Sequence, residues 1–517
     1  MRFCAQISFI LFILKNASFL LILRFKLESM KINIFFSITL ITLFSCHPNA
    51  PEYRFNAEGR GVWMSPSPDI NWDSTMAVLS KAGFNMIFPY MCSSGRSYYP
   101  SEFLPMKGER DELAMCIEAA HSHGIEVHVW KMNWNLNGAL EDSVNRYERE
   151  NRIQISYDNK RVPQVSKELG WNQKFDWLCP AHLKNRELEK NVMLELVRKY
   201  EVDGVHFDYM RYPYEPLCYC QSCREKFIKE TALKIDKWPD DVWKEGKYRA
   251  VYLEWRKELI TSSAEEIAKA IHDYDPYVCV SLAARPNLNS AYFHDGQEWW
   301  TWDDKSILDF VCPMNYTADP EEYLTDIQNH LPLIEGNIPY YGGIGLFLNK
   351  KSEMLMESIR KGRAYGQDGF VVFSYKWGGL ENMLDTVGQF LNNKDHTLLP
   401  HRAPSVSFYM HSPSKKTEEG LQGFMTGTDI DCEVVVPFKA KLRQGISRIK
   451  GRLKIFQINN GFEQIIMPVD ITEAERMQFT LNINNPGIHR ILLTGEMELS
   501  NGNVKPFVSK SYPFQIL

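Results

Sequence analysis

An aspartate at the end of an apolar run is the residue whose type and position point most clearly to chemistry. In the run 205–208 the polar residues His206 and Asp208 alternate with two apolar ones, so they share one side of a predicted strand. Arg211 follows closely enough to hold the Asp208 carboxyl ionised, because a nearby cation lowers a carboxyl pKa. Such an acid can act as a nucleophile, a general base or a charge stabiliser. The alternative is a buried Asp–Arg pair that only shapes the loop.

Acid–base chemistry at such a carboxylate often uses a second carboxyl group as general acid. Glu298 is the first choice, because three tryptophans surround it in the sequence and apolar walls raise a carboxyl pKa. Several other acids stay open for this role, and for each a solvated acidic loop is an equally good interpretation: Asp69, Glu102, Asp295, Asp303 and Asp304.

Aromatic and hydrogen-bonding residues gather where the predicted strands end. Aromatic rings stack on the apolar face of a sugar, and polar side chains bind its hydroxyls, although aromatics also dominate protein cores. His206 could equally be a core histidine with its hydrogen bonds satisfied. The predicted substrate-binding residues are Arg60, Trp63, Trp130, Trp177, His206, Arg211, Tyr212, Asn315, Tyr316 and Trp377.

Three cysteines lie close together at Cys218, Cys220 and Cys223. They resemble a structural zinc knuckle that lacks its fourth ligand, which Cys179 or a histidine could supply. A local disulfide or free thiols are the alternatives, and an oxidising compartment favours disulfides. We therefore expect no required cofactor, with a structural zinc ion as the candidate metal.

The N-terminal segment has the features of an export signal. An apolar stretch at 32–44 follows Lys31 and is too short to span a bilayer comfortably. It ends at Cys46 in a sequence that resembles a bacterial lipobox, and Met30 looks like the true start. We predict a leader over 1–46, a tether over 47–57 and a lipid anchor on Cys46 in the bacterial cell envelope. A retained membrane helix is the alternative.

The elements that position these residues follow one repeated unit between residues 58 and 400. A helical pattern ends at a glycine and a short buried run follows, as in a helix C-cap leading into a parallel strand. A long segment from Asn133 to Phe175 shows no clear periodicity and reads as a functional loop. The predicted strands are 61–64, 84–88, 125–130, 205–207, 278–282, 310–314, 338–344 and 370–373.

Eight strands alternating with helices predict an α/β fold of the (β/α)8 TIM-barrel type, which carries its chemistry on the loops after the strands. A doubly wound open sheet is the alternative, but no glycine-rich phosphate motif follows the first strand. Residues 401–517 alternate in short segments between turn signals such as Asn460-Gly461, which predicts a small all-β, Ig-like sandwich.

Composition excludes some classes of protein. The chain has 517 residues, 44% of them hydrophobic and 24% charged, which is typical of a globular protein. The net charge of −5 argues against a nucleic-acid partner, because phosphate binding needs a basic surface.

The run Asp203-Gly204-Val205-His206-Phe207-Asp208-Tyr209-Met210-Arg211-Tyr212-Pro213 resembles the central motif of the glycosyl hydrolase-like ten family, with support from 60–63, 177–180 and 313–317. The resemblance covers about 58–395 and implies a glycosidase-type barrel that acts on a bacterial or dietary polysaccharide, with peptidoglycan glycan strands as one candidate. A non-catalytic glycan-binding barrel is the alternative. A metal-dependent envelope hydrolase ranks third; it depends on the cysteine cluster, His128 and His206.

Overall fold

The computed structural model describes residues 57–214, 217–303, 305–334, 337–391, 397–418, 420–458 and 460–517. The predicted leader, Cys46, Met30 and nearly all of the predicted tether lie outside these residues. No helix within the described part of the chain combines the length and the apolar character that crossing a membrane requires.

An eight-stranded parallel barrel forms the N-terminal part of the described fold, as the sequence predicts. Each strand pairs with its sequence neighbour, and β1 pairs with β8. A single bridge between Val311 and Tyr340 joins β6 to β7 and closes the ring. The strands are β1 (Gly59–Met64), β2 (Met86–Ser93), β3 (Glu126–Met132), β4 (Gly204–Asp208), β5 (Cys279–Ala284), β6 (Phe310–Pro313), β7 (Tyr341–Gly345) and β8 (Gly369–Phe373).

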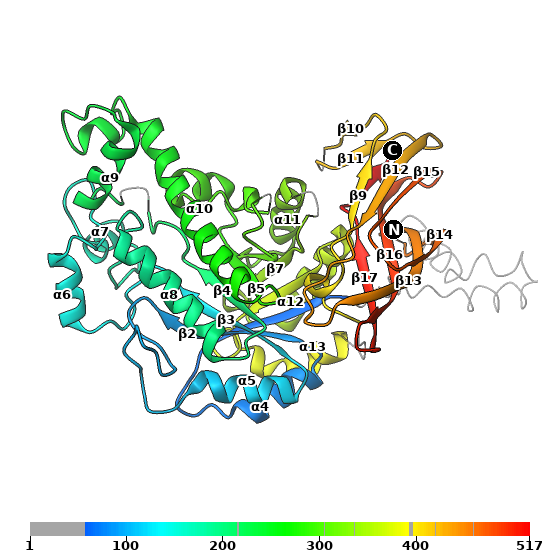
Figure 1. The fold of residues 1–517 in the computed structure, drawn as a ribbon, viewed down its shortest axis with the longest axis horizontal. Coiled ribbons are helices and arrows are strands. Elements are labelled where there is room, and N and C mark those ends of the chain that lie inside the picture. Colours follow the sequence, from blue (N-terminus) through cyan, green and yellow to red (C-terminus); the bar gives the residue numbers. More distant parts are fainter. Residues whose placement is uncertain are drawn as a thin grey trace, which may run out of the picture. The chain divides into compact units, whose positions relative to one another are not determined.

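Helices surround the barrel strands (Figure 1). The Asn71 and Asp111 side chains cap the first turns of α4 and α5 by accepting backbone N–H groups. Gly83 and Gly124 then adopt positive φ after these helices, as the glycine punctuation of the sequence predicts. The helices are α4 (Trp72–Lys81), α5 (Glu112–Ser122), α8 (Leu183–Lys199), α10 (Arg249–Tyr274), α11 (Pro320–Ile334), α12 (Ser352–Tyr365) and α13 (Leu384–Leu391).

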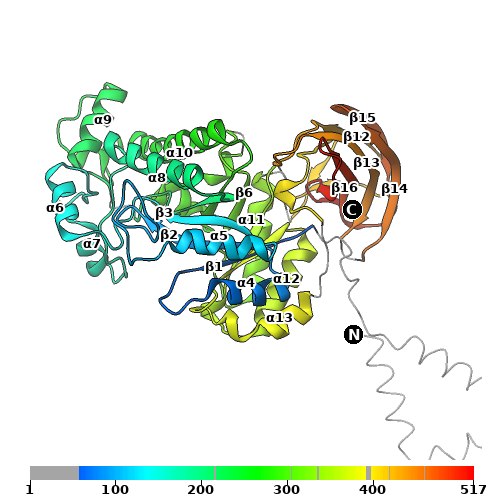
Figure 2. The same ribbon diagram turned by 60° about the horizontal axis from the view of Figure 1, so that its bottom comes forward.

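Two insertions interrupt the regular alternation. The segment after β3, read from sequence as a loop, contains the short helices α6 (Glu141–Arg149) and α7 (Val162–Glu168). The segment after β4 contains α9 (Gln221–Thr231). Figures 1 and 2 both show α6, α7 and α9 gathered at one side of the barrel. The prediction of a loop failed because these helices are short and α6 is mostly polar, so they carry little apolar periodicity.

The barrel interior is packed with side chains rather than hollow. Inward-facing residues from β1, β2, β5, β6, β7 and β8 form one apolar cluster, which includes Phe88, Phe310 and Tyr341. Leu399 joins this cluster although it follows the last barrel helix in sequence. The segment after the barrel therefore contributes to the barrel core.

The same segment closes the barrel at the end where the strands begin. The Glu126 carboxylate, at the start of β3, accepts hydrogen bonds from Arg402 at 3.0 and 3.1 Å and contacts His401 Nε2 at 3.0 Å. Burial raises the pKa of Glu126, but the charges of Arg402 and His401 outweigh burial and hold it well below its ordinary value. Arg402 also donates to the carbonyls of Tyr277 and Asp203 at 2.7 and 2.9 Å. This arrangement ties the starts of several strands to the chain that leads into the next domain.

The C-terminal region is an all-β domain of two sheets around one apolar core. One sheet has three strands and the other seven, so the domain is larger than a constant-type Ig sandwich of four plus three strands. Gly461 takes a positive φ in the turn before β14, at one of the predicted Asn-Gly sites. The strands are β9 (Ser407–Met410), β10 (Lys415–Lys416), β11 (Gln422–Phe424), β12 (Asp429–Val436), β13 (Ile446–Gln457), β14 (Glu463–Ile471), β15 (Glu475–Asn482), β16 (Gly487–Leu499), β17 (Val504–Lys510) and β18 (Phe514–Ile516).

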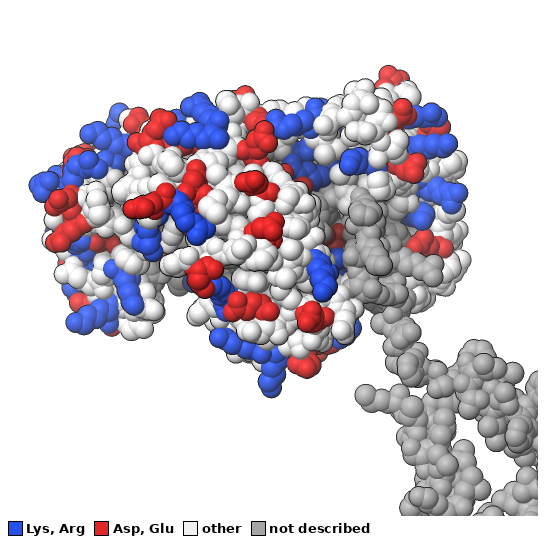
Figure 3. Space-filling model, turned by 90° about the horizontal axis from the view of Figure 1, so that it is seen from below, with Lys and Arg blue, Asp and Glu red and all other residues white. Residues whose placement is uncertain are grey.

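Charges on the surface are mixed in sign. Figure 3 shows Lys and Arg side chains interspersed with Asp and Glu over the face that it presents. This face offers no broad basic patch, in keeping with the net charge of −5.

Arg402→Ala should destabilise the protein strongly, because it leaves the Glu126 carboxylate without its main partner. Removing one member of a buried ion pair costs about 3–5 kcal/mol. Urea denaturation followed by tryptophan fluorescence measures the effect. Arg448→Ala is the matched control, since Arg448 forms an exposed ion pair with Asp470 in the β domain. Equal small shifts in the two variants would contradict a structural role for the Arg402 contact.

Candidate active site at the carboxyl ends of the barrel strands

Asp208 is the last residue of β4 and lies almost fully buried at the carboxyl end of the barrel. The Trp130 indole N–H donates to its Oδ2 at 3.0 Å, and the Tyr209 backbone N–H donates to its Oδ1 at 2.7 Å. Both contacts arise because β3 and β4 are parallel neighbours, with Trp130 opposite His206 and Met132 opposite Asp208. The two donors fix the orientation of the carboxyl group, as a site for transition-state chemistry requires.

The environment of Asp208 disfavours its charged form. Burial raises the pKa of Asp208 above its ordinary value, and the Arg211 charge and the Trp130 hydrogen bond lower it only in part. The sequence-based expectation that Arg211 holds the carboxyl ionised therefore underestimated desolvation. A carboxyl group with a raised pKa beside a fixed cation is typical of catalytic sites, although structural pairs also show such shifts.

Tyr209 has a positive φ of 56°, which is uncommon for a bulky residue. The same residue donates its backbone N–H to the Asp208 carboxyl. Strained backbone of this kind is concentrated at functional sites, where the surroundings hold it in place. Sequence reasoning could not find this feature, because nothing in the residue type signals it.

A second buried carboxylate, Asp295, shares Arg211 with Asp208. The Arg211 Nη1 lies 4.0 Å from Asp295 Oδ1, and Arg285 Nε lies 3.0 Å from Asp295 Oδ2. Burial raises the pKa of Asp295, while the charges of Arg211 and Arg285 oppose the rise. The backbone of Tyr212 also donates to the Asp295 carbonyl at 2.8 Å. Asp295 thus anchors the loop that carries Arg211.

Glu298, the predicted general acid, lies in a different environment. Its Oε2 pairs with Lys257 of α10 at 2.8 Å, and its side chain is 23% exposed. The structure thus brings Asp295 rather than Glu298 to Arg211. Among the other acids left open, Asp69 pairs with Lys376, Glu102 pairs with Lys199, and Asp303 accepts a hydrogen bond from Asn337. Asp304 lies outside the described residues.

Four of the predicted binding residues are buried, either inside the barrel or within the packed segments that follow β3 and β4. Trp63 donates through Nε1 to His206 Nε2 at 3.0 Å, so the proton of the imidazole lies on Nδ1 and is donated to Ser281 Oγ at 2.8 Å. Burial lowers the pKa of His206 far below its ordinary value, which keeps the ring neutral. Trp177 and Tyr212 are fully buried, and Tyr212 packs under the Arg256 guanidinium. These four side chains support the site rather than face solvent.

Arg60 lies at the opposite end of the barrel from Asp208, near the start of β1. Its Nε donates to Glu58 at 2.7 Å, and its backbone N–H donates to Asn85. The structure therefore does not bring Arg60 together with Asp208. The sequence showed a buried strand with a polar residue, but the polar residue precedes the strand's core instead of following it.

Aromatic rings line the carboxyl end after β6, β7 and β8. Tyr316 stacks on Phe373 with ring centroids 5.4 Å apart, and Phe347 stacks on Trp377 at 4.4 Å. Phe373 also contacts Trp130 at 6.0 Å, which links these rings to the residue that binds Asp208. Trp377 is 58% exposed, so it can offer a ring face to a ligand.

Further rings lie on the insertion side of Asp208. Tyr209 packs against Trp177 at 4.9 Å, and Arg211 lies over the Tyr209 ring at 4.8 Å. The ring centroids of Trp171 and Tyr214 lie 3.7 Å apart, and Trp171 is 45% exposed. Sequence reasoning did not single out Trp171, because it lies in the segment without periodicity.

Asn315 follows β6 and is fully buried. Its Nδ2 donates to the Tyr340 hydroxyl at 2.8 Å, while no hydrogen bond to its Oδ1 is found among the described residues. The Asn315 Oδ1 can thus accept a hydrogen bond from a further group.

Two clusters among the described residues could hold a metal ion. One is Cys179, Cys218, Cys220 and Cys223, and the other is Glu126, His128 and His401. The clusters include the cysteines and the His128 of the third hypothesis, a metal-dependent envelope hydrolase, but neither includes Asp208 or His206. The second cluster is the closure described above, where Arg402 occupies both Glu126 oxygens.

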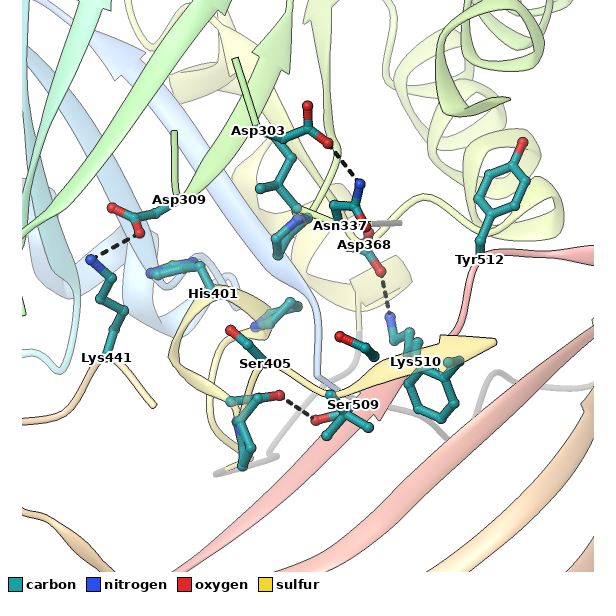
Figure 4. A pocket seen from close by; sticks show the side chains of 18 of the residues that line it. Asp303, Asp309, Asn337, Asp368, His401, Ser405, Lys441, Ser509, Lys510 and Tyr512 are labelled. Atoms are coloured by element: carbon teal, nitrogen blue, oxygen red, sulfur yellow. Dashed lines mark hydrogen bonds and ion pairs between the residues drawn. The ribbon is translucent and has the colours of Figure 1, made fainter. Parts of the chain in front are cut away.

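A pocket of about 470 Å³ lies far from Asp208, where barrel strands begin (Figure 4). Asp368, just before β8, pairs with Lys510 at 3.4 Å, and Asp309, just before β6, pairs with Lys441 at 3.0 Å. These acids are engaged in structural pairs, so the pocket is a junction and not the candidate site.

Comparison with known proteins places the chain in a family. The model for glycosyl hydrolase-like 10 matches residues 58–330, more than half of the chain. A barrel with an oriented acid at the carboxyl end of β4 fits a glycosidase-type protein, and the chain belongs to the glycosyl hydrolase-like 10 family. The family prediction made from the motif around Asp208 is confirmed.

Individual relatives are distant. The chain is 21% identical over 376 residues to "Glycosyl hydrolase YngK" of Bacillus subtilis (strain 168), covering 59% of this chain and 72% of that protein. It is 21% identical over 327 residues to an "S-layer-related protein" of Niallia circulans, covering 54% of this chain but only 20% of that protein. The glycoside hydrolase domain of PgaB (BpsB) from Bordetella bronchiseptica shares the fold, with a TM-score of 0.52 and 13% identity over 65% of this chain and 100% of that chain.

Asp208→Asn should stabilise the protein more at pH 7 than at pH 4. The folded pKa of Asp208 lies above its ordinary value of 3.8, so its stability contribution is largest below 3.8 and falls as pH rises through the folded pKa. A neutral asparagine escapes this penalty. Thermal denaturation of both proteins between pH 4 and pH 7 measures the difference.

Asp309→Asn is the control of opposite sign. Burial raises the pKa of Asp309, but the hydrogen bond from His272 and the Lys441 charge lower it to about 2. Its contribution is present above 3.8 and is lost as pH falls, so the asparagine variant should be less stable at pH 7. The account of Asp208 fails if both variants respond to pH with the same sign.

Proposed function

We propose that this protein is a glycoside hydrolase that cleaves a bacterial or dietary polysaccharide, with Asp208 in contact with the sugar. The observation that carries the proposal is the Asp208 carboxyl group, which two N–H donors orient at the carboxyl end of the barrel between aromatic rings. Peptidoglycan glycan strands are one candidate substrate. Membership of a glycosyl hydrolase-like family supports the reaction class.

Each group in the site has a distinct part in the proposed reaction. Hydrolysis breaks the bond from the anomeric carbon to the leaving oxygen, adds water at that carbon and delivers a proton to the leaving group. Asp208, ionised with the help of Arg211, acts on the anomeric carbon as nucleophile or through an activated water. Glu298 stays the proposed proton donor, because its carboxyl is accessible. Asp295 is almost fully enclosed and acts as a positioning residue through Arg211.

The proposed location is the bacterial cell envelope or the cell exterior. A relative named as an S-layer-related protein supports this location. We further propose that Cys46 carries a lipid anchor, as the lipobox-like sequence before it predicts.

A glycan-binding barrel without catalytic activity is the second candidate. It is favoured by the ion pairs that engage the remaining carboxylates, since Asp295 binds two arginines and Glu298 binds Lys257. In this alternative the exposed aromatic rings bind a glycan and Asp208 contributes hydrogen bonds.

Asp208→Asn should reduce the release of soluble sugars from polysaccharides by about 10²-fold or more, as expected when a catalytic acid or base is removed. The assay uses a panel of polysaccharides that includes peptidoglycan stripped of its stem peptides, with reducing ends and fragment masses as readouts. Asp326→Asn on α11 is the matched control, because it neutralises a half-buried acid on an outer helix.

The role of Glu298 is tested by the choice of leaving group. Glu298→Gln should lose activity on a native glycan but keep most of it on an activated aryl glycoside, which needs no proton from an acid. Equal loss on both substrates would remove Glu298 from this role.

Wild-type protein that binds a glycan without releasing fragments would favour the binding barrel.

Trp377→Ala should weaken glycan binding several-fold, because it removes an exposed ring that can stack on a sugar. Affinity electrophoresis with the polysaccharide that wild type cleaves or binds gives the measurement. Phe462→Ala in the β domain controls for loss of an exposed aromatic ring elsewhere. Unchanged binding in Trp377→Ala would exclude this ring from the glycan site.

A further inference from the structure

Four buried cysteine thiols meet beside the candidate active site. Cys179 comes from the long segment after β3, and Cys218, Cys220 and Cys223 come from the segment between β4 and α10. The four Sγ atoms all lie within 4.8 Å of one another. Cys179 Sγ is 3.4 Å from both Cys220 Sγ and Cys223 Sγ. The fourth member of the cluster is thus Cys179, one of the two candidates that the sequence left open.

We propose that Cys179, Cys218, Cys220 and Cys223 bind one zinc ion in a closed structural site. Zinc bound by four thiolates is tetrahedral with Zn–S distances of about 2.3 Å, which places the sulfurs about 3.8 Å apart. The observed separations of 3.4 Å and no more than 4.8 Å enclose this value. Four protein ligands leave no open position for water, so the ion has a structural and not a catalytic role.

A pair of disulfides fits the arrangement less well. Cys179 approaches Cys220 and Cys223 equally, so the geometry prefers neither pairing. Mutual proximity of all four sulfurs is what one central cation requires, whereas two disulfides require only two close pairs.

The backbone around the sulfurs is held from outside the cluster. Asn185 Nδ2 donates to the Cys179 carbonyl at 2.9 Å, and the Tyr252 hydroxyl donates to the Cys218 carbonyl at 2.6 Å. The buried Arg256 guanidinium donates to the carbonyl of Leu217 and brings positive charge close to a site whose four thiolates exceed the charge of zinc. Such outer contacts orient metal ligands and tune the ion.

The ion would join the two segments that build one side of the candidate site. Trp177 lies two residues before Cys179, and Arg211 lies seven residues before Cys218. The Arg211 guanidinium lies 6.0 Å from the Trp177 ring, so these segments already touch next to Asp208. Zinc would fix this contact by a bond network that apolar packing alone does not provide.

The first test is the metal content of the purified chain, measured by plasma mass spectrometry without added metal. We expect one zinc per chain in wild type and in Cys432→Ser, which alters a buried cysteine of the β domain. Cys220→Ser and Cys223→Ser should lose the metal. Zinc retained by both cluster variants would overturn the assignment of these ligands.

The second test does not depend on folding of a variant. A thiol-blocking mercurial added to wild type should release one zinc per chain, detected by a colorimetric chelator. The mass of the untreated wild-type chain, denatured without reduction, should show that none of these four cysteines has formed a disulfide, which would remove two hydrogen atoms. Wild type without zinc, whether its thiols are free or oxidised to disulfides, would overturn the proposal. Neither readout requires glycosidase activity, so failure of the proposed function leaves this test intact.

Discussion

Parallel pairing of β3 with β4 is the constraint on which the candidate site depends. It places Trp130 and Asp208 side by side at the same end of the ring, so an indole N–H meets a carboxylate that the sequence separates by many residues. The same alternation that turns Asp208 inward also turns His206 inward, one layer deeper. There His206 meets Trp63 and becomes part of the packed interior. The alternation of side chains along β4 thus places Asp208 in the candidate site and His206 in the packed interior.

Desolvation decides the electrostatics of this region. Asp208 and Asp295 both lie in low-dielectric surroundings, and a shared arginine only partly offsets the cost of their charges. Well-packed apolar side chains at these positions would avoid the cost of burying the charges. Retaining two desolvated acids next to a tyrosine with positive φ is the pattern expected where stability has been traded for function.

Sequence patterns were sufficient for the fold because they are local. Glycines after helices and short apolar runs indicated every barrel strand, and turn signals indicated the β domain. The site was harder, because it depends on which end of a strand faces the loops and on what enters from distant segments. Arg60 and Asp208 both flank buried runs, yet only the second follows its run. Glu298 and Asp295 are three residues apart, and only packing against Arg211 separates them.

The segment from Leu399 to Arg402 shows that a boundary in sequence need not be a boundary in folding. These residues come after the last barrel helix, yet they fill the barrel interior and neutralise Glu126. The barrel therefore completes its core with residues that lie between its last helix and the first strand of the β domain. Gene fusion or exchange at the apparent junction would leave the barrel with an open base and an uncompensated acid. A barrel separated from the β domain therefore keeps its core and the partner of Glu126 only if it carries the chain as far as Arg402.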